Sequence, residues 1–259
     1  MTILFLSIAV IAIFILSTLF GYLVPMMSKE QKFKEFWKKC PECEKNKKAE
    51  EIYHVTNYWK YGGYCKKHAP KVWKNVLFTT VFVLFSTFPF VWEYISTKSF
   101  FSVESVCFAV VSMLLVYAAT TDILGLVIPD FANLSIFTIG LGLLIYNLIR
   151  TGDWSLLLTY GIGLICVALP LFLLCLAGKS GFGDVKLFAA LGIFLGWKQL
   201  LLVLFIAVVV GAIFAIFKKI ANPELSRKSQ IPFGPFICLG TYITMLFGDI
   251  ILTSYFNLM

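Results

Sequence analysis

Long runs of apolar residues, separated by short polar segments, dominate the chain. Most runs approach or exceed the ~20 apolar residues with which a helix crosses a bilayer, and none shows the polar face that a soluble helix turns to water. The pattern therefore predicts an all-α membrane protein with about eight transmembrane helices, the sixth of them short. The predicted spans are Ile3–Val24, Asn75–Ile95, Phe100–Thr120, Phe131–Leu148, Trp154–Ala177, Asp184–Gly196, Leu200–Phe217 and Phe233–Phe256.

Composition supports this fold class. Hydrophobic residues make up 59% of the 259 residues and charged residues 14%, whereas a soluble domain has about 25% charged residues. The first run, Ile3–Val24, is too long for the apolar part of a signal peptide, and no basic residue precedes it. We therefore expect a retained transmembrane helix that ends at Pro25, and we expect no nucleic-acid partner.

The segment Ser28–Lys74 is the one long polar stretch, and it is crowded with Lys. The positive-inside rule places such a segment in the cytoplasm, so the N-terminus should face outward, to the periplasm or the outside of the cell. The chain then divides into a first helix (1–27), a cytoplasmic loop domain (28–74) and a seven-helix membrane domain (75–259).

The basic residues of the later loops agree with this orientation. Loops predicted outside carry one basic residue each, and the inside loops together carry more. The outside loops are Ser96–Ser99, Arg150–Asp153 and Trp197–Gln199, and the inside loops are Thr121–Asp130, Gly178–Gly183 and Lys218–Ile231. The ends of the apolar runs that border these inside loops are therefore predicted at the cytoplasmic face.

Two carboxylates stand at the ends of apolar runs on this cytoplasmic side, Asp122 and Asp184. An Asp at the centre of a membrane helix costs about 2.5–3.5 kcal/mol, and less near the interface, so such residues point to function. Gly181 and Gly183 precede Asp184 and leave room for another backbone to approach closely. We expect Asp122 and Asp184 to meet and to form an acid/base pair.

Two further charged residues lie beside this pair. Asp130 follows Pro129 at a span boundary, where it either caps the next helix at Ncap or takes a substrate or catalytic role. Lys186 follows Asp184 by two positions and either extends to lipid headgroups or helps to hold the charge of the pair.

A pair of carboxyls that shares one proton can hydrolyse a peptide. The ionised group takes a proton from water, while the protonated group donates to the carbonyl oxygen. A Ser-His-Asp set is excluded, because the only His residues, His54 and His68, lie in the polar segment.

Two other classes of function compete with a peptidase. A transporter or channel also uses intramembrane carboxylates, but both predicted carboxylates lie at one membrane face, whereas conduction usually needs polar groups near the midplane. A structural subunit of a secretion assembly would need neither carboxylate, so it would tolerate Asp184→Asn.

Three Cys and one His of the polar segment have the spacing of a metal site. Cys40 and Cys43 form a C-x-x-C pair, and Cys65 and His68 form a C-x-x-H pair. These two pairs predict a tetrahedral structural zinc site. The cytoplasm disfavours disulfides, and so short a segment buries too little core to fold without a bound metal. The remaining cysteines lie within apolar spans and read as small buried hydrophobes: Cys107, Cys166, Cys175 and Cys238.

Taken together, these motifs resemble the type IV prepilin peptidases of the Gly-x-Gly-Asp group of intramembrane aspartic proteases. Their order and spacing agree from Asp122 to the C-terminus, and the paired Cys motifs extend the agreement toward the N-terminus. The motifs are Asp122 with Ile128-Pro129-Asp130, then Gly181-Phe182-Gly183-Asp184-Val185-Lys186-Leu187, Ala190-Leu191-Gly192, Leu195-Gly196-Trp197 and Ile231-Pro232-Phe233-Gly234-Pro235-Phe236.

The resemblance implies a bacterial inner-membrane aspartic endopeptidase of a type IV pilus or type II secretion system. Such an enzyme removes the basic leader of prepilins or pseudopilins after a Gly at the cytoplasmic face. Asp122 and Asp184 match the two catalytic aspartates of the family. We expect Gly181, Gly183, Asp130 and Lys186 to contact the substrate.

Relatives with the cytoplasmic Cys loop typically also N-methylate the new terminus with S-adenosylmethionine. This chain departs from their pattern in three places. His68 stands where Cys is usual, Glu44–Tyr64 lacks the usual Asn-Ile-Pro, and Gly21–Pro25 lacks the usual Asn and Arg. Zinc binding is compatible with a His ligand, whereas the second activity stays open.

Overall fold

The computed structural model describes residues 88, 102–177, 181–221 and 231–257. The first two predicted spans, apart from Phe88, and the whole cytoplasmic loop domain lie outside these residues. The chain divides into two compact units, Met1–Phe88 and Pro89–Met259, and the seven helices named below belong to the second.

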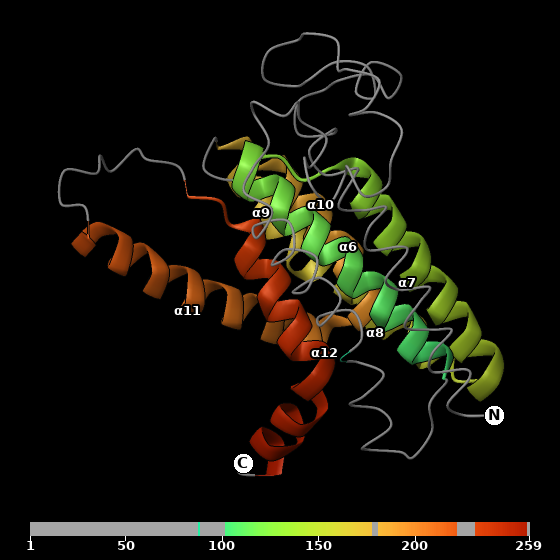
Figure 1. The fold of residues 1–259 in the computed structure, drawn as a ribbon. Coiled ribbons are helices and arrows are strands. Elements are labelled where there is room, and N and C mark those ends of the chain that lie inside the picture. The colour runs from blue at the N-terminus through green and yellow to red at the C-terminus, as the bar shows by residue number, and fades with distance from the viewer. Residues whose placement is uncertain (1–87, 89–101, 178–180, 222–230, 258–259) are drawn as a thin grey trace, which may run out of the picture. The chain divides into compact units, whose positions relative to one another are not determined.

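The described part of the second unit is built from helices (Figure 1). They are α6 (Val103–Gly125), α7 (Asp130–Thr151), α8 (Ser155–Cys166), α9 (Ala168–Leu176), α10 (Phe182–Leu195), α11 (Trp197–Ala221) and α12 (Gly234–Asn257). Among the residues that the structure describes, five segments are long and apolar enough to cross a membrane: Val103–Ile123, Asp130–Thr151, Ser155–Leu176, Trp197–Ala221 and Gly234–Asn257. The prediction of a helical multi-pass membrane protein is confirmed for this part of the chain.

The span predicted at Trp154–Ala177 is two helices, α8 and α9, which are separated at Val167. Pro170 explains the break, because it has no N–H to donate and its ring clashes with the carbonyl four residues earlier, that of Cys166. The two helices together still make one candidate span.

Helix α10 is short and central. Its 14 residues extend about 21 Å, at 1.5 Å per residue, which is less than the ~30 Å of a hydrocarbon core. It is not among the candidate spans, so this part of the eight-span prediction is not supported. Helices α7, α8 and α9 pack against it, and Leu187, Phe188 and Leu191 are fully buried.

Glycines bring α8 and α10 into close contact. A Cβ atom at Gly163 would lie 2.5 Å from the carbonyl oxygen of Gly192, so the two backbones nearly touch. Such contacts between small residues are typical of helix packing in membranes. They hold α10, and the carboxylate at its start, against the rest of the unit.

The turn between α10 and α11 is shorter than predicted. The expected outside loop at Trp197–Gln199 is wrong, because Trp197 already begins α11 and only Gly196 joins the helices. Gly196 has φ = 79°, a conformation that favours Gly over other residues.

The outer surfaces of the long helices are apolar. Leu134, Ile149, Phe205, Phe217 and Ile220 are all exposed, as expected of side chains that face lipid. Helix α11 has the highest mean hydropathy of the candidate spans, and few of its residues are buried. In Figure 1 its C-terminal half, in orange, projects away from the other labelled helices.

Candidate active site

Asp122 lies in the last turn of α6 and is only 6% exposed. The predicted loop from Thr121 is therefore wrong at its start, because α6 continues to Gly125. Leu126, in the left-handed conformation, ends the helix, and its N–H donates to the carbonyl oxygen of Asp122 at 2.9 Å. Asp122 is thus held on a rigid helical turn.

The start of α12 binds the Asp122 side chain. The N–H of Gly234 donates to Oδ2 of Asp122 at 2.8 Å. The first N–H groups of a helix have no partner within the helix and carry partial positive charge, so they favour a carboxylate. A Cβ atom at Gly234 would lie 2.7 Å from this oxygen, which explains why the contact needs Gly.

Asp184 lies in the first turn of α10, after the N-cap Gly181, and is partly buried. It is close enough to Asp122 for the two charges to interact. Both carboxylates are also near enough to interact electrostatically with the thiol of Cys238, which is buried on α12. The structure therefore brings Asp122 and Asp184 into one site between α6, α10 and α12.

The two glycines before Asp184 differ in their surroundings. A Cβ atom at Gly183 would lie 3.2 Å from Cβ of Ile128, so the segment before α7 approaches α10 closely at this point. A Cβ atom at Gly181 would meet Oδ2 of Asp184 at 3.4 Å, an ordinary contact. The close contact at Gly183 is with the side chain of Ile128, so the expected approach of another backbone stays a prediction.

Asp130 is paired with Lys186. Nζ of Lys186 donates to Oδ1 of Asp130 at 2.7 Å, and the Asp130 side chain is 75% exposed. The predicted capping role is wrong, because Pro129 is the N-cap of α7 and no side chain caps this helix. Lys186 also lies over the ring of Phe182, 5.0 Å from its centroid. This ion pair joins α7 to α10 beside the carboxylates.

Local sequence reasoning missed Gly234 and Cys238 as neighbours of the pair, and only the resemblance places the Ile231–Phe236 stretch near it. The Ile231–Phe236 stretch, with two prolines and one glycine, was the available signal for Gly234, because it marks the start of α12. Nothing distinguished Cys238 from the other cysteines of the apolar runs. The predicted zinc ligands Cys40, Cys43, Cys65 and His68 lie outside the described residues.

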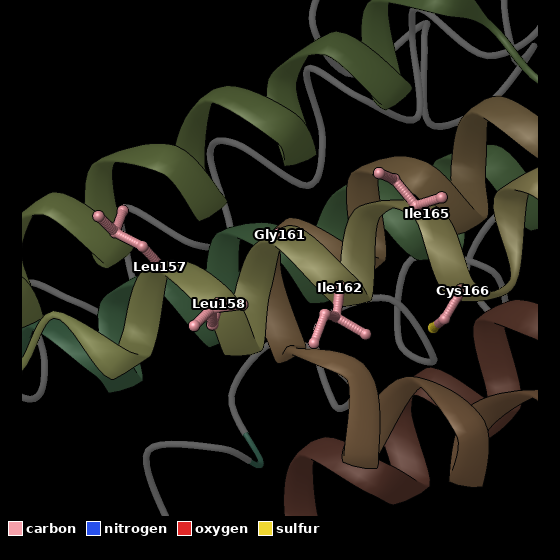
Figure 2. A pocket seen from close by; sticks show the side chains of 6 residues that line it. All are labelled: Leu157, Leu158, Gly161, Ile162, Ile165 and Cys166. Atoms are coloured by element: carbon pink, nitrogen blue, oxygen red, sulfur yellow. The ribbon is translucent and has the colours of Figure 1, made fainter.

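A separate apolar hollow of about 560 Å³ lies along α8. Its lining residues are Leu157, Leu158, Gly161, Ile162, Ile165 and Cys166 (Figure 2). Neither carboxylate lines it. This lining suits a surface that faces lipid rather than the chemistry of the site.

Comparisons with known proteins agree with the predicted resemblance. Residues 109–216, which include Asp122 and Asp184, match the type IV leader peptidase family. A protein of Legionella pneumophila named prepilin leader peptidase/N-methyltransferase is 37% identical over 130 residues, which are 49% of this chain and 45% of that protein. The resemblance to type IV prepilin peptidases is confirmed.

Two further relatives carry the same name. The protein of Aeromonas salmonicida strain A449 is 43% identical over 84 residues, 32% of this chain and 28% of its own length. The protein of Bacillus subtilis strain 168 is 35% identical over 81 residues, 31% of this chain and 32% of its own length. The chain thus covers less than half the length of these curated relatives. No solved structure matches it.

Proposed function

We propose that this chain is a membrane aspartic endopeptidase that removes the basic leader from type IV prepilins or pseudopilins. The observation that carries the proposal is the meeting of Asp122 and Asp184 at one site, within a segment similar to the type IV leader peptidase family. The names of the relatives support prepilin as the substrate class.

The contacts of the two carboxylates suggest separate roles. The Gly234 N–H and the start of α12 stabilise negative charge on Asp122, so Asp122 is the base that takes a proton from water. Asp184 then holds the shared proton and donates it to the carbonyl oxygen of the scissile bond as water attacks the carbonyl carbon. Collapse of this gem-diol intermediate breaks the C–N bond, returns one hydroxyl proton to Asp184 and passes the proton on Asp122 to the leaving amine.

The position of the pair favours this chemistry over conduction. Asp122 lies in the last turn of α6 and Asp184 in the first turn of α10. Asp130, in the first turn of α7, is at the same end. A path for ions would need polar groups through the middle of the helices, whereas the centre of α10 is apolar, with Leu187, Phe188 and Leu191 buried.

Asp130 is the proposed contact for a basic residue of the leader. Its carboxylate is exposed and accepts from Lys186, so a Lys or Arg of the substrate would share or replace that partner. Gly181 comes shortly before Asp184 and presents no side chain to an incoming peptide, whereas the corresponding space at Gly183 is taken by Ile128.

The proposal extends to the rest of the chain. We place the protein in a bacterial inner membrane with the N-terminus in the periplasm and the active site at the cytoplasmic face. Zinc would be held by Cys40, Cys43, Cys65 and His68, a donor set with the chemistry of a structural site. N-methylation with S-adenosylmethionine is a second candidate activity, which the names of the relatives support.

Incubation of the full chain with a prepilin in liposomes, followed by mass analysis of the new N-terminus, tests the proposal. The expected product lacks the leader, and an added methyl group would reveal the second activity. Asp122→Asn and Asp184→Asn should each abolish cleavage, because neither carboxyl can replace the other. Normal cleavage by either variant, when both are inserted in the membrane, would remove that residue from the mechanism.

A further inference from the structure

Asn133 is a buried polar residue that the proposed mechanism does not use. Its side chain is 5% exposed, and neither its Nδ2 nor its Oδ1 has a hydrogen-bond partner among the residues that the structure describes. Leaving a buried polar group without a partner is costly, because its hydrogen bonds to water are lost and not replaced. Thr244 is the only other described residue with such an atom. An unpaired carboxamide therefore calls for a partner from outside this part of the chain.

Asn133 belongs to the inner face of α7. The buried residues Asn133, Ile136, Gly140, Leu143 and Leu144 follow one another at helical spacing. A Cβ atom at Gly140 would lie 2.8 Å from Ile193 and 2.9 Å from Phe194, so this face contacts α10. The Asn133 side chain therefore lies on the face of α7 that packs against α10.

The register between α7 and α10 sets the depth of Asn133. Ile128 contacts the position of Gly183, and Asp130 pairs with Lys186. Together with the contact at Gly140, these contacts show that α7 and α10 run in the same direction. Asn133 is then level with Lys186 and Leu187, about one helical turn, roughly 5 Å, beyond Asp184.

The register with α6 gives the same depth. Helix α6 ends at Gly125 and α7 begins at Asp130, and the two helices pack side by side in opposite directions. Asp122 is three residues before the end of α6, and Asn133 is three residues after the start of α7. Asn133 is thus level with Asp122 and lies within about one helical turn of Asp184.

We propose that Asn133 is a positioning residue that binds the extended backbone of the substrate beside the scissile bond; this inference rests on the proposed function. A peptide must leave its helical conformation to reach two carboxyls, and its exposed N–H and C=O groups then lack partners. In apolar surroundings each such group costs several kcal/mol. A carboxamide offers both a donor and an acceptor, as a peptide group does, so Asn133 can satisfy both.

Cleavage rates of two matched variants test this role. Asn133→Ala removes the polar group. Asn133→Ser is nearly the size of the Ala variant but keeps a hydrogen-bond donor and acceptor. We expect Asn133→Ala to lower kcat/KM for prepilin by about tenfold or more, since one lost hydrogen bond in a buried site has that effect. Asn133→Ser should restore part of the loss. Asn147→Ala, at the other end of α7, is the control and should cleave like the wild type.

Thermal unfolding separates positioning from a structural role. Asn133→Ala and Asn133→Ser should unfold at the same temperature, and Asn133→Leu should unfold no lower than the wild type, because it removes an unpaired polar group. Equal losses of activity in both variants, together with lower unfolding temperatures, would overturn the inference. Wild-type cleavage by Asn133→Ala would also overturn it. A wild-type chain that cleaves no prepilin would instead remove the proposed function, and this inference with it.

Discussion

At the residue scale, a backbone N–H holds one of the two carboxylates in place. Gly234 donates to Oδ2 of Asp122 at 2.8 Å, and the absence of a side chain at Gly234 lets α12 begin directly against the carboxylate. The orientation of Asp122 therefore depends on a position that carries no reactive group.

Gly234→Ala should lower kcat/KM for prepilin cleavage by about a hundredfold. Its Cβ atom would lie 2.7 Å from Oδ2 and 3.1 Å from Cγ of Asp122, so the carboxylate must move. A displacement of ~1 Å at a catalytic group is enough for such a loss. Gly142→Ala is the control, because a Cβ atom there would meet nothing within 4 Å and lies away from both carboxylates. Equal cleavage rates for the two variants would contradict this account of Asp122.

The residues of the site differ in how visible they are in the sequence. Asp122 and Asp184 could be found because a charge beside an apolar run is costly and therefore conspicuous. Gly234 acts through its backbone, and Asn133 is one polar residue within a long apolar run, so neither has a side-chain pattern that marks it. The Asp130–Lys186 pair could not be predicted from local sequence, because it depends on the packing of α7 against α10.

At the element scale, the order of the described helices followed from apolar runs, whereas their breaks did not. The run Trp154–Ala177 has one hydrophobic pattern throughout, yet Pro170 divides it near Val167. Gly196 joins α10 directly to α11, because a Gly with positive φ can change the direction of the chain without a longer loop. Both breaks were marked by a Pro or Gly that hydropathy alone overlooks.

Gly192→Ala should destabilise the protein by about 1–3 kcal/mol, the usual effect of adding volume to a packed interface. The new methyl group would collide with the carbonyl of Gly163 and push α8 away from α10. Gly142→Ala is the control, since a Cβ atom there meets nothing within 4 Å, and Ala favours a helix more than Gly does. Thermal unfolding in detergent should show a lower midpoint for the first variant only. Similar midpoints for both would contradict the close packing of α8 and α10.

At the scale of the whole molecule, charge alone does not attract the substrate. The chain has a formal net charge of +8, and a prepilin leader is itself basic. Exposed charges are screened beyond ~10 Å at 0.1 M salt, so the repulsion is weak, but no general attraction opposes it. On the proposed function, recognition would then rest on local contact with carboxylates such as Asp130 and on burial of the substrate's apolar helix.

Shortening the apolar segment of a prepilin should therefore reduce cleavage more than neutralising one Lys of its leader. Burial of each apolar side chain contributes about 1.5–3 kcal/mol, whereas an exposed ion pair contributes at most about 1 kcal/mol. Asp130→Lys should reduce cleavage of basic leaders selectively, and a prepilin with a neutral leader is the control. Cleavage rates in liposomes measure both effects. If a leader peptide without its apolar segment is cut as efficiently as the full substrate, burial in the membrane does not drive recognition.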